Sequence, residues 1–279
     1  IIPPSNILIV YSLASGGVSI GALFVAGYLP GIVIGISLMI VAGIIAYKKN
    51  YPIAQKIKFK DGILRFIDSL PSLFLIVLVI GGIVAGYFTA TEASAIAVLY
   101  TFILSVLIYR EVKWKEIPKI LLDTSSTTAI VMLLIGTSMG MSWIISYENI
   151  PQNVSASLIA ISNSPIIILL IINFILLIVG TFMDMTPAVL IFTPIFLPVV
   201  MKLGIDPIHF GIIMVLNLSI GLCTPPVGSV LFIGCGIAGT SIARVLKPLL
   251  PLFLAMLAAL LLITFIPEIS MFLPKVFGY

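Results

Sequence analysis

The 279-residue chain is 61% hydrophobic, only 9% of its residues are charged, and its mean hydropathy is +1.31. These values exclude a soluble globular domain, in which about 25% of the residues are charged. A spanning helix needs about 20 predominantly apolar residues, and the chain contains many such runs. The sequence therefore predicts an all-α polytopic membrane protein, and its net charge of +4 concerns membrane topology rather than nucleic acid.

Most Lys and Arg residues fall in three clusters, at 48–65, 110–119 and 244–247. Placing all three clusters in the cytoplasm satisfies the positive-inside rule. The resulting topology predicts spans at 22–47, 66–86, 91–109, 120–147, 208–243 and 248–266. It also predicts a basic, partly amphipathic segment at 50–65 along the inner surface, and an outer loop with the sequence ENIPQNVS.

Residues 165–204 fit this topology as a hairpin with both ends outside. The apolar arm SPIIILLIINFILLIVG is followed by the interruption TFMDMTP and a second arm, AVLIFTPIFLPVVM. Two full spans satisfy the charge pattern, and so does a re-entrant pair of half-helices. Re-entrance is favoured because the second arm is short and interrupted by proline, and because irregular tips occur at membrane depth only where protein or a cavity covers them.

Two double-proline breaks, IIPPS at 1–5 and GLCTPPVGS at 221–229, belong to an internal repeat. When the two proline pairs are aligned, SNILIVYSLASGGVSIGALF pairs with VGSVLFIGCGIAGTSIARVL, and a long apolar helix follows both. The charge pattern gives the two copies opposite orientations in the membrane. Related units of opposite orientation are typical of inverted-repeat secondary transporters, so this is the architecture that the sequence predicts.

The breaks supply the chemistry expected of such a fold. Broken helices meet near the midplane, where half-helix N-termini face anions and unwound carbonyls coordinate a cation. Each proline removes a backbone donor, Thr224 adds a hydroxyl, and Gly221 and Gly228 allow sharp turns. The alternative is a simple proline kink without a site.

The hairpin tip contributes Gly180, Thr181, Asp184 and Thr186. Asp184 is the only acid from residue 165 to 201, and a carboxylate within a membrane segment is a functional candidate because its burial is costly. Asp184 is interpreted either as an ion ligand or as the N-cap of a helix that starts at Thr186. Asn217, one turn before Gly221, either orients the broken segment or forms an interhelical hydrogen bond.

Four other residues of types that often bind ligands or protons, and one tryptophan, are interpreted as structural. Glu92 ends the sequence TATE, which predicts a capping box. His209 follows a proline at an outer helix start and is expected at the membrane interface, and Trp114 in the second basic cluster suits interfacial anchoring. Cys223 and Cys235 lack ligand spacing and are expected to be free thiols.

Three long blocks resemble the large membrane (M) subunit of the TRAP transporters, the tripartite ATP-independent periplasmic systems. They are IIPPSNILIVYSLASGGVSIGALFVAGYLPG, GYFTATEASAIAVLY and GTFMDMTPAVLIFTPIFLPVVMKLGIDPIHFGIIMVLNLSIGLCTPPVGSVLF. The resemblance implies an elevator-type fold like that of the ion transporter superfamily, with re-entrant hairpins and broken helices. It also implies a sodium-coupled importer of a carboxylate in a bacterial inner membrane.

The resemblance further implies partners and substrates. The partners are a small four-helix membrane subunit, separate or fused upstream, and a soluble periplasmic substrate-binding protein. SNILIVYSLASGG is closer to the sialic-acid systems, and C4-dicarboxylates, other organic acids or proton coupling are the alternatives. No cofactor beyond Na⁺ is expected. A channel is disfavoured by the lack of a polar lining ring, and an enzyme by the lack of HExxH, GxSxG or paired aspartates.

The site residues follow from the two breaks and the tip. The sodium ligands, many through backbone carbonyls, are predicted to be Pro3, Pro4, Ser5, Gly180, Thr181, Asp184, Thr186, Asn217, Gly221, Thr224, Pro226 and Gly228. The substrate is predicted to contact Ser5, Asn6, Thr186 and Thr224. In the family the first ion site uses an earlier hairpin that this chain lacks, so only the second half of that site, around Pro3, Pro4, Ser5 and Asn6, is present. The resemblance implies a complete second ion site, formed by the 180–187 tip and the 221–228 break. The chain begins without Met within an element, so we expect it to be the later part of a longer protein.

The predicted domains follow the same topology, with the hairpin and broken helices forming a transport domain that moves against scaffold helices. They are half of a broken helix at 1–21, scaffold helices with the basic segment at 22–123, a helix and outer loop at 124–164, the re-entrant hairpin at 165–207, the second broken helix at 208–247, and a final scaffold helix at 248–279.

Overall fold

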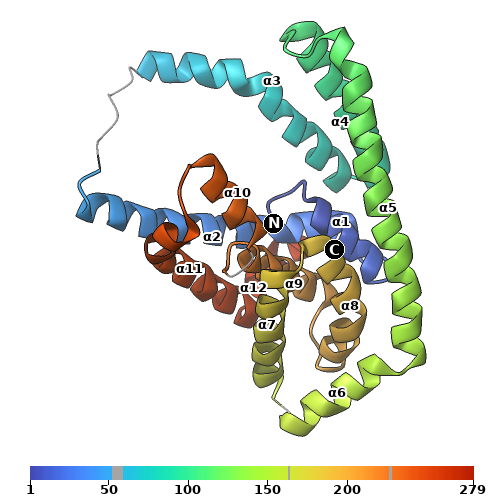
Figure 1. Cartoon of the computed structure of the whole chain (residues 1–279). Helices are drawn as coiled ribbons and strands as arrows, with labels where there is room; N and C mark the ends of the chain where they lie inside the picture. Colours follow the sequence, from blue (N-terminus) through green and yellow to red (C-terminus); the bar gives the residue numbers. More distant parts are fainter. Residues whose placement is uncertain (52–58, 163, 226–227) are drawn as a thin grey trace. The chain divides into compact units, whose positions relative to one another are not determined.

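The computed structural model describes residues 1–51, 59–162, 164–225 and 228–279, and within them every regular element is a helix (Figure 1). In chain order they are α1 (Asn6–Ala14), α2 (Ile20–Lys48), α3 (Phe59–Val84), α4 (Ala90–Phe102), the π-helix η1 (Ile103–Ile108), the 3₁₀-helix η2 (Trp114–Glu116), α5 (Ile117–Tyr147), α6 (Ile150–Ile161), α7 (Pro165–Phe182), α8 (Met185–Lys202), α9 (Pro207–Gly221), α10 (Ser229–Ile237), α11 (Ile242–Phe265) and α12 (Glu268–Val276).

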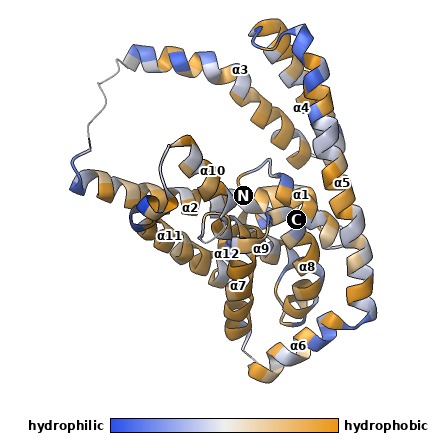
Figure 2. Cartoon of the chain, viewed as in Figure 1, coloured by the Kyte–Doolittle hydropathy of each residue, from blue (hydrophilic) through white to orange (hydrophobic). Residues whose placement is uncertain are grey.

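Among the described residues, seven helical stretches are long and apolar enough to cross a membrane. They lie in α2, α3, α4 with η1, η2 with α5, α7, α8 and α11, and α9 is a shorter apolar helix. Many apolar side chains of these helices are exposed, and most of the ribbon of these helices has hydrophobic colours in Figure 2. In a helix the backbone hydrogen bonds are satisfied within the segment, so helices with such side chains are suited to lipid. The predicted class of an all-α polytopic membrane protein is confirmed.

The chain forms two compact units. Unit 1 comprises Ile1–Lys48 and Leu134–Tyr279, and unit 2 comprises Lys49–Leu133. The centre of unit 1 is α9, in which every residue from His209 to Leu218 is buried. It packs against α1, α2, α7, α8, α11 and α12. A helix that is apolar around its whole circumference is expected in the interior of a bundle.

The internal repeat is confirmed at the level of secondary structure. Each double-proline break is followed by a nine-residue half-helix, α1 in the first copy and α10 in the second. Each half-helix ends in a bend with a left-handed glycine, Gly17 and Gly239 respectively. The long helices α2 and α11 then begin at Ile20 and Ile242. Both offsets equal the one that aligns the proline pairs, so the bends and the starts of the long helices correspond in the two copies. The starts of the half-helices, Asn6 and Ser229, differ by one residue in this alignment.

The predicted hairpin consists of α7 and α8, which are both 18 residues long. We expected a short second arm, but α8 continues as a helix through Pro194 and Pro198. A proline within a helix removes one hydrogen bond and bends the helix without necessarily ending it. The helix also starts at Met185, one residue before the predicted start.

Three other boundaries differ from the prediction, and one of them is the start of α11, which lies at Ile242 and not at 248. Residues 59–65 form the first turns of the continuous helix α3, whereas 52–58 of the predicted segment lie outside the described residues. The expected outer loop at 148–155 contains the start of α6. Pro151 sits in its first turn, where the missing N–H costs nothing because that group has no intrahelical partner.

The contacts group the helices in another way than the predicted transport and scaffold domains do, although they do not test which helices move. Residues 22–123 and 248–279 were grouped as scaffold, but α2, α11 and α12 pack on α9 within unit 1. Only 49–133 form a separate unit. The reason is that an apolar helix such as α9 needs neighbours on all sides, and α2 and α11 supply two of them. Which helices move stays a prediction.

Unit 2 contains α3, α4, η1, η2 and the first half of α5. The predicted capping box opens α4: the Thr89 N–H donates to Glu92 Oε2 at 2.8 Å, and the Glu92 N–H donates to Thr89 Oγ1 at 3.3 Å. The structural interpretation of Glu92 is therefore confirmed. Helices α3 and α4 pack together, and the Tyr100 hydroxyl donates to the Pro71 carbonyl at 2.7 Å.

Candidate functional site

The hairpin tip and the second break lie against each other in unit 1. Gly180 and Gly221 are in backbone contact, because a Cβ added to Gly221 would lie 2.6 Å from the Gly180 Cα and carbonyl carbon. Small residues allow helices to approach this closely in membranes. Beyond the crossing, the Gly228 N–H donates to the Thr181 carbonyl at 3.4 Å. The fold therefore brings together four residues that the sequence assigned to one site.

This contact bears on the membrane depth of the hairpin. The tip adjoins the break between α9 and α10, and these two helices are 15 and 9 residues long. At 1.5 Å per residue they extend roughly 22 and 14 Å, so the break is far from both ends of the pair. A tip beside an interior break favours the re-entrant alternative over two full spans.

Backbone carbonyls converge on Gly228. A Cβ at this position would lie 2.8 Å from the Thr224 carbonyl oxygen and 3.1 Å from that of Leu222. Gly228 has a φ of +31° and precedes the first residue of α10. With the Thr181 oxygen on its N–H, three carbonyl oxygens surround this glycine. They form a small cradle that a side chain at 228 would fill, hereafter the Gly228 cradle.

The sequence contains a signal for the Leu222 carbonyl, although the predicted ligand set omits this residue. In a helix the carbonyl of residue i accepts from the N–H of residue i+4. Pro225 and Pro226 lack this group, so the carbonyls of Gly221 and Leu222 lose their helical partners. The Gly221 carbonyl accepts instead from the Thr224 N–H at 2.8 Å. Pro226 itself, a predicted ligand, lies outside the described residues.

Two threonine hydroxyls at the site donate back to their own helices. Thr224 Oγ1 donates to the Ile220 carbonyl at 2.7 Å, and Thr181 Oγ1 donates to the Ile178 carbonyl at 2.7 Å. Each bond uses the single hydroxyl proton and leaves the oxygen lone pairs available. Both hydroxyls therefore keep the capacity to accept a hydrogen bond or to coordinate a cation.

Asp184 and Thr186 flank the start of α8. Asp184 occupies the N-cap position, but its exposed carboxylate makes no capping hydrogen bond. The Thr186 side chain is half-buried and likewise makes no hydrogen bond in the described part of the chain. The N-cap interpretation is thus correct for the backbone of Asp184 and is not supported for its side chain. Coordination by this carboxylate stays a prediction.

Asn217 forms an interhelical hydrogen bond, the second of the two interpretations. Its Nδ2 donates to Asn173 Oδ1 of α7 at 2.6 Å, and Asn173 Nδ2 donates to Thr264 Oγ1 of α11 at 3.1 Å. All three side chains are buried, and Asn217 Oδ1 has no partner. The amides thus connect α9, α7 and α11 one turn before the break.

His209 is buried, whereas we expected it at the membrane interface. Its Nδ1 lies 2.6 Å from Ser270 Oγ of α12, and its Nε2 lies 3.3 Å from the Thr264 carbonyl. The expectation was wrong because α11 and α12 fold back over the start of α9. Nothing in the local sequence signals these partners, since they lie 55 and 61 residues away.

The first double-proline break, at residues 1–5, has different surroundings from the second. Pro3 is buried, Pro4 and Asn6 are exposed, and Ser5 is half-buried at the N-cap of α1 without a side-chain cap. Among the described residues, no hydrogen bond joins these four to the 180–187 tip or to the second break. The hairpin tip and the second break are thus in direct contact, whereas no described hydrogen bond joins the first break to either of them. The ion-binding role of these residues stays a prediction.

The oxygen atoms of the second site suit a hard monovalent cation. The described residues contain no cluster of three or more His, Cys, Asp or Glu side chains that would hold a metal ion. Carbonyl and hydroxyl oxygens are instead the ligands that hard cations prefer. The Gly228 cradle, with the lone pairs of the two threonines nearby, is the group of oxygens in this region that fits such an ion.

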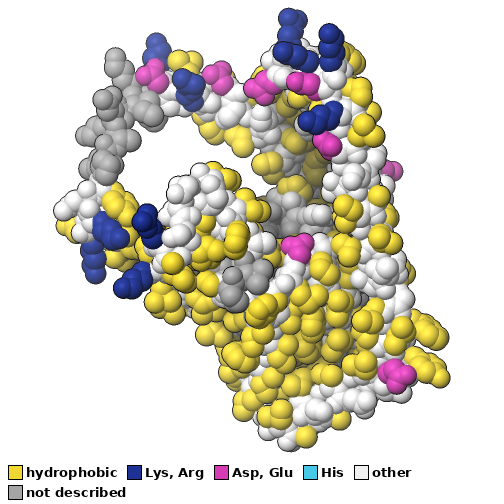
Figure 3. All heavy atoms as spheres, viewed as in Figure 1, with side chains coloured by type: hydrophobic (Ala, Val, Ile, Leu, Met, Phe, Trp, Pro, Cys, Tyr) yellow, Lys and Arg dark blue, Asp and Glu magenta, His cyan; other side chains and the backbone are white. Residues whose placement is uncertain are grey.

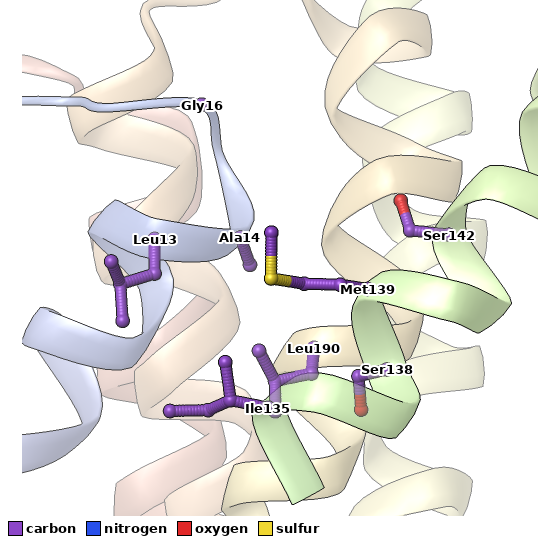
Figure 4. Close-up of a pocket in the computed structure, with 8 residues that line it drawn as sticks. All are labelled: Leu13, Ala14, Gly16, Ile135, Ser138, Met139, Ser142 and Leu190. Atoms are coloured by element: carbon purple, nitrogen blue, oxygen red, sulfur yellow. The ribbon is translucent and has the colours of Figure 1, made fainter. Parts of the chain in front are cut away.

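A separate cavity of about 250 Å³ lies in unit 1 (Figure 4). It is bounded by the end of α1, by residues 135–142 of α5 and by Leu190 of α8. Figure 4 shows the hydroxyls of Ser138 and Ser142 among apolar side chains. The cavity contains none of the predicted site residues and no charged group, so it lacks the features that would recognise a carboxylate.

A family model matches residues 1–269 of the chain. The model describes the DctM component of tripartite ATP-independent periplasmic transporters.

The chain is also similar in sequence to several curated proteins. The chain is 56% identical over 277 residues to the uncharacterized protein YgiK of Salmonella typhimurium. It is 38% identical over 278 residues to the C4-dicarboxylate TRAP transporter large permease protein DctM of Pseudomonas aeruginosa. It is 35% identical over 280 residues to the sialic acid TRAP transporter large permease protein SiaM of Vibrio cholerae. These alignments cover 99–100% of the chain and 63–65% of each relative's length.

Proposed function

We propose a transport function from one premise: the chain belongs to the DctM component family of the tripartite ATP-independent periplasmic (TRAP) transporters. Its multi-pass helical fold and the relatives named as large permeases agree with that family. The chain spans less than two thirds of those relatives. The activity of the whole protein is therefore proposed here as secondary transport of a solute across the membrane, not as catalysis.

Sodium is the proposed coupling ion. The single observation that carries this proposal is the Gly228 cradle, where the carbonyls of Thr181, Leu222 and Thr224 surround one left-handed glycine. Because Thr181 lies on the hairpin and the other two on the break, an ion at this point would draw the two elements together. Each sodium ion that enters down a potential of 100 mV supplies about 2.3 kcal/mol, before its concentration gradient is counted.

The proposed substrate is a carboxylate that lies near the half-helix starts. The first turns of α8 and α10 follow the tip and the break, and helix N-termini favour anions. The free side chain of Thr186, with Ser5 and Asn6 at the start of α1, supplies hydrogen-bonding groups without charge. The relatives are named for C4-dicarboxylate and for sialic acid at similar identity. Both classes are therefore candidates, and our preference for sialic acid stays a prediction.

An elevator movement of unit 1 is proposed, with α2 and α11 included in the moving body. The buried bond between Asn173 of α7 and Thr264 of α11 supports this grouping, because breaking it would leave polar groups unpaired in a low-dielectric interior. Residues 59–133 of unit 2 then belong to the scaffold.

The proposed setting is a bacterial inner membrane, with the family's small membrane subunit and a periplasmic substrate-binding protein as partners. The family description supports both the transport system and its periplasmic component. The lipid bilayer itself is supported by the apolar outer faces of the spans.

Uptake by proteoliposomes tests the proposal. The intact transporter, with its small subunit and binding protein, is supplied with labelled sialic acid or a labelled C4-dicarboxylate. Each substrate is offered with an inward sodium gradient, with potassium in place of sodium, and with an inward proton gradient alone. We expect accumulation of one substrate, unaltered, only with sodium. Uptake driven by the proton gradient alone would refute sodium coupling, and chemical conversion of the label would refute transport.

Two matched variants test the site. Thr224→Ala removes a hydroxyl beside the Gly228 cradle, and Ser219→Ala removes one that makes the same bond to its own helix, to the Val215 carbonyl at 2.7 Å. We expect Thr224→Ala to raise the sodium concentration for half-maximal uptake about tenfold, since a lost ligand to a charged group costs about 1.5 kcal/mol. Ser219→Ala should leave it unchanged. An equal response of the two variants would exclude Thr224 from the site.

A further inference from the structure

Unit 2 contains a groove beside an irregular helix. After α4 the chain forms the π-helix η1, whose wide turn is marked by the Tyr109 N–H donating to the Leu104 carbonyl at 2.7 Å. The Ser105 carbonyl then accepts from the N–H groups of Glu111 and Val112, at 3.0 and 3.3 Å. These bonds turn the chain back toward α5. Single π-turns within helices occur frequently at functional sites.

The groove runs between α4 with η1 and the start of α5, and its volume is about 460 Å³. Its walls are almost entirely apolar, with three hydroxyl side chains among them. The lining residues are Ala97, Val98, Thr101, Phe102, Ser105, Val106, Val112, Ile117, Ile120, Leu121 and Thr124. The Thr124 hydroxyl donates to the Ile120 carbonyl at 2.7 Å. An apolar groove of this volume suits a hydrocarbon chain.

Basic side chains gather at one end of the groove, where α4 turns into α5. Four basic residues are exposed here, and each lies within two residues of the lining residues Val112 or Ile117 in the chain: Arg110, Lys113, Lys115 and Lys119. Figure 3 shows Lys and Arg side chains gathered at this end of unit 2. Two carboxylates share the stretch, Glu111 and Glu116, so the cations outnumber them.

These cations are available to a ligand. None of the four forms a salt bridge with a carboxylate in the described part of unit 2, and the Glu116 carboxylate accepts from the Lys113 backbone N–H at 2.9 Å. Trp114 is exposed and meets Phe102, a lining residue, edge to face at 5.8 Å between ring centres. Exposed tryptophan is typical of the headgroup level of a membrane. The basic end of the groove therefore has the composition expected at the headgroup level.

We propose that this groove binds an acyl chain of an anionic phospholipid of the inner leaflet, and that the lipid phosphate contacts the four basic side chains. Cytoplasmic basic pockets between transmembrane helices recognise anionic headgroups. The cytoplasmic placement follows from the positive-inside rule. The site goes beyond the proposed function and lies in a unit that contains none of the predicted ion or substrate residues.

Lipid binding is measured on the intact protein, purified in detergent with any subunit that it retains. The readouts are the thermal midpoint with added phosphatidylglycerol or phosphatidylcholine, and the lipid retained in native mass spectrometry. One variant changes the four basic residues to Gln. Its control changes four basic residues elsewhere to Gln: Lys48, Lys49, Arg244 and Lys247. Ala97→Phe and Thr124→Phe fill the groove from opposite walls, and Ala95→Phe, which does not line it, is their control.

We expect phosphatidylglycerol to raise the thermal midpoint of the wild type more than phosphatidylcholine does. Each basic contact that is removed should weaken binding about fivefold, so the fourfold Gln variant should lose the difference and its control should keep it. Both groove-filling variants should lose retained lipid while Ala95→Phe keeps it. Two filling positions are used so that misfolding of one leaves the other informative.

Three results would overturn the proposal. Equal effects of the two lipids on the wild type would show that the headgroup is not recognised. Retention of lipid by both groove-filling variants would place the acyl chain elsewhere. A cross-linker placed at Thr101 that captures a partner subunit, without any retained lipid, would show that the groove binds a protein helix. No arm of the experiment measures transport, so failure here is distinguishable from failure of the proposed function.

Discussion

The two half-helices of the internal repeat, α1 and α10, have equal lengths and equivalent places in their copies, yet they are seated in different ways. In α1 the side chains of Leu8 and Tyr11 are 0% exposed. The equivalent residues of α10, Val230 and Ile233, are 50% and 64% exposed. The first copy is fixed through its half-helix, which packs on α8 and α9. The second copy is fixed through the break that precedes its half-helix, at Gly221 and Gly228.

This difference shows that a repeated sequence pattern fixes where a helix breaks but not what holds it. The α1 half-helix gains a ring contact, with Tyr11 lying over Gly211 of α9. The α10 half-helix has glycines at 234 and 236 with open space around them. Substitutions at equivalent positions should therefore have unequal effects on the free energy of unfolding, which is measured by reversible unfolding in mixed micelles.

The largest effect is expected for Gly221→Ala. A Cβ there would overlap the backbone of Gly180, which cannot move aside as a side chain can. Overpacking of this kind costs roughly 3 kcal/mol of unfolding free energy. The control is Gly234→Ala in α10, where nothing lies within 4 Å and alanine favours the helix. Equal stability of the two variants would show that the tip and the break are not in contact.

Leu8→Ala is expected to have a smaller effect than Gly221→Ala. Its control is Val230→Ala, the equivalent position in α10. Truncation of a fully buried leucine costs about 2–5 kcal/mol in soluble cores. The loss should be roughly 2 kcal/mol here, because lipid is as apolar as the side chain and only packing contacts are lost. Val230→Ala should change the unfolding free energy by less than about 0.5 kcal/mol. A similar loss in both variants would contradict the difference in seating.

Substitutions in the buried amide pair, Asn217 and Asn173, should have an effect between those of Leu8→Ala and Tyr11→Phe. Asn217→Leu leaves Asn173 Oδ1 without its donor, and an unpaired buried group costs roughly 1.5 kcal/mol. Asn173→Leu should cost about the same amount. The double variant should lose less than the sum, because neither amide then lacks its partner. Strict additivity in this double-mutant cycle would mean that the two amides do not interact.

The smallest effect is expected for Tyr11→Phe. The Tyr11 hydroxyl donates to the Pro207 carbonyl at 2.6 Å and joins the first copy to the start of α9. Its loss should cost about 0.6 kcal/mol, the average for hydrogen bonds between membrane helices, because the Pro207 carbonyl can still accept the helical bond from residue 211. A loss as large as that of Leu8→Ala would mean that this bond, rather than packing, seats α1.

Much of the fold could be predicted from the sequence because its signals are local. Apolar runs define the spans, and each proline pair predicts a half-helix after it. The start of α11 was missed, because the basic residues Arg244 and Lys247 were interpreted as a loop, whereas the helix begins at Ile242. The missed boundaries have local causes as well. Pro194 and Pro198 bend α8 without ending it, and Pro151 fits the first turn of α6.

The candidate site was predicted in part. Gly180, Thr181, Gly221 and Gly228 were assigned together on sequence grounds, and they are in contact. The Leu222 carbonyl was missed although Pro226 signals it four residues ahead. The partners of Asn217 and His209 could not be predicted, because each depends on a helix at least 44 residues away in the chain.

The sequence by itself determined the membrane class, the repeat, the positions of the breaks and the carbonyls that those breaks release. Each of these follows from the chemistry of single residues, such as the missing N–H of proline or the apolarity of a run. Only the tertiary structure decided which half-helix is buried, which amides pair, and that hairpin and break meet at two glycines. Such pairings depend on the packing of helices that are distant in sequence, and local composition carries no information about that packing.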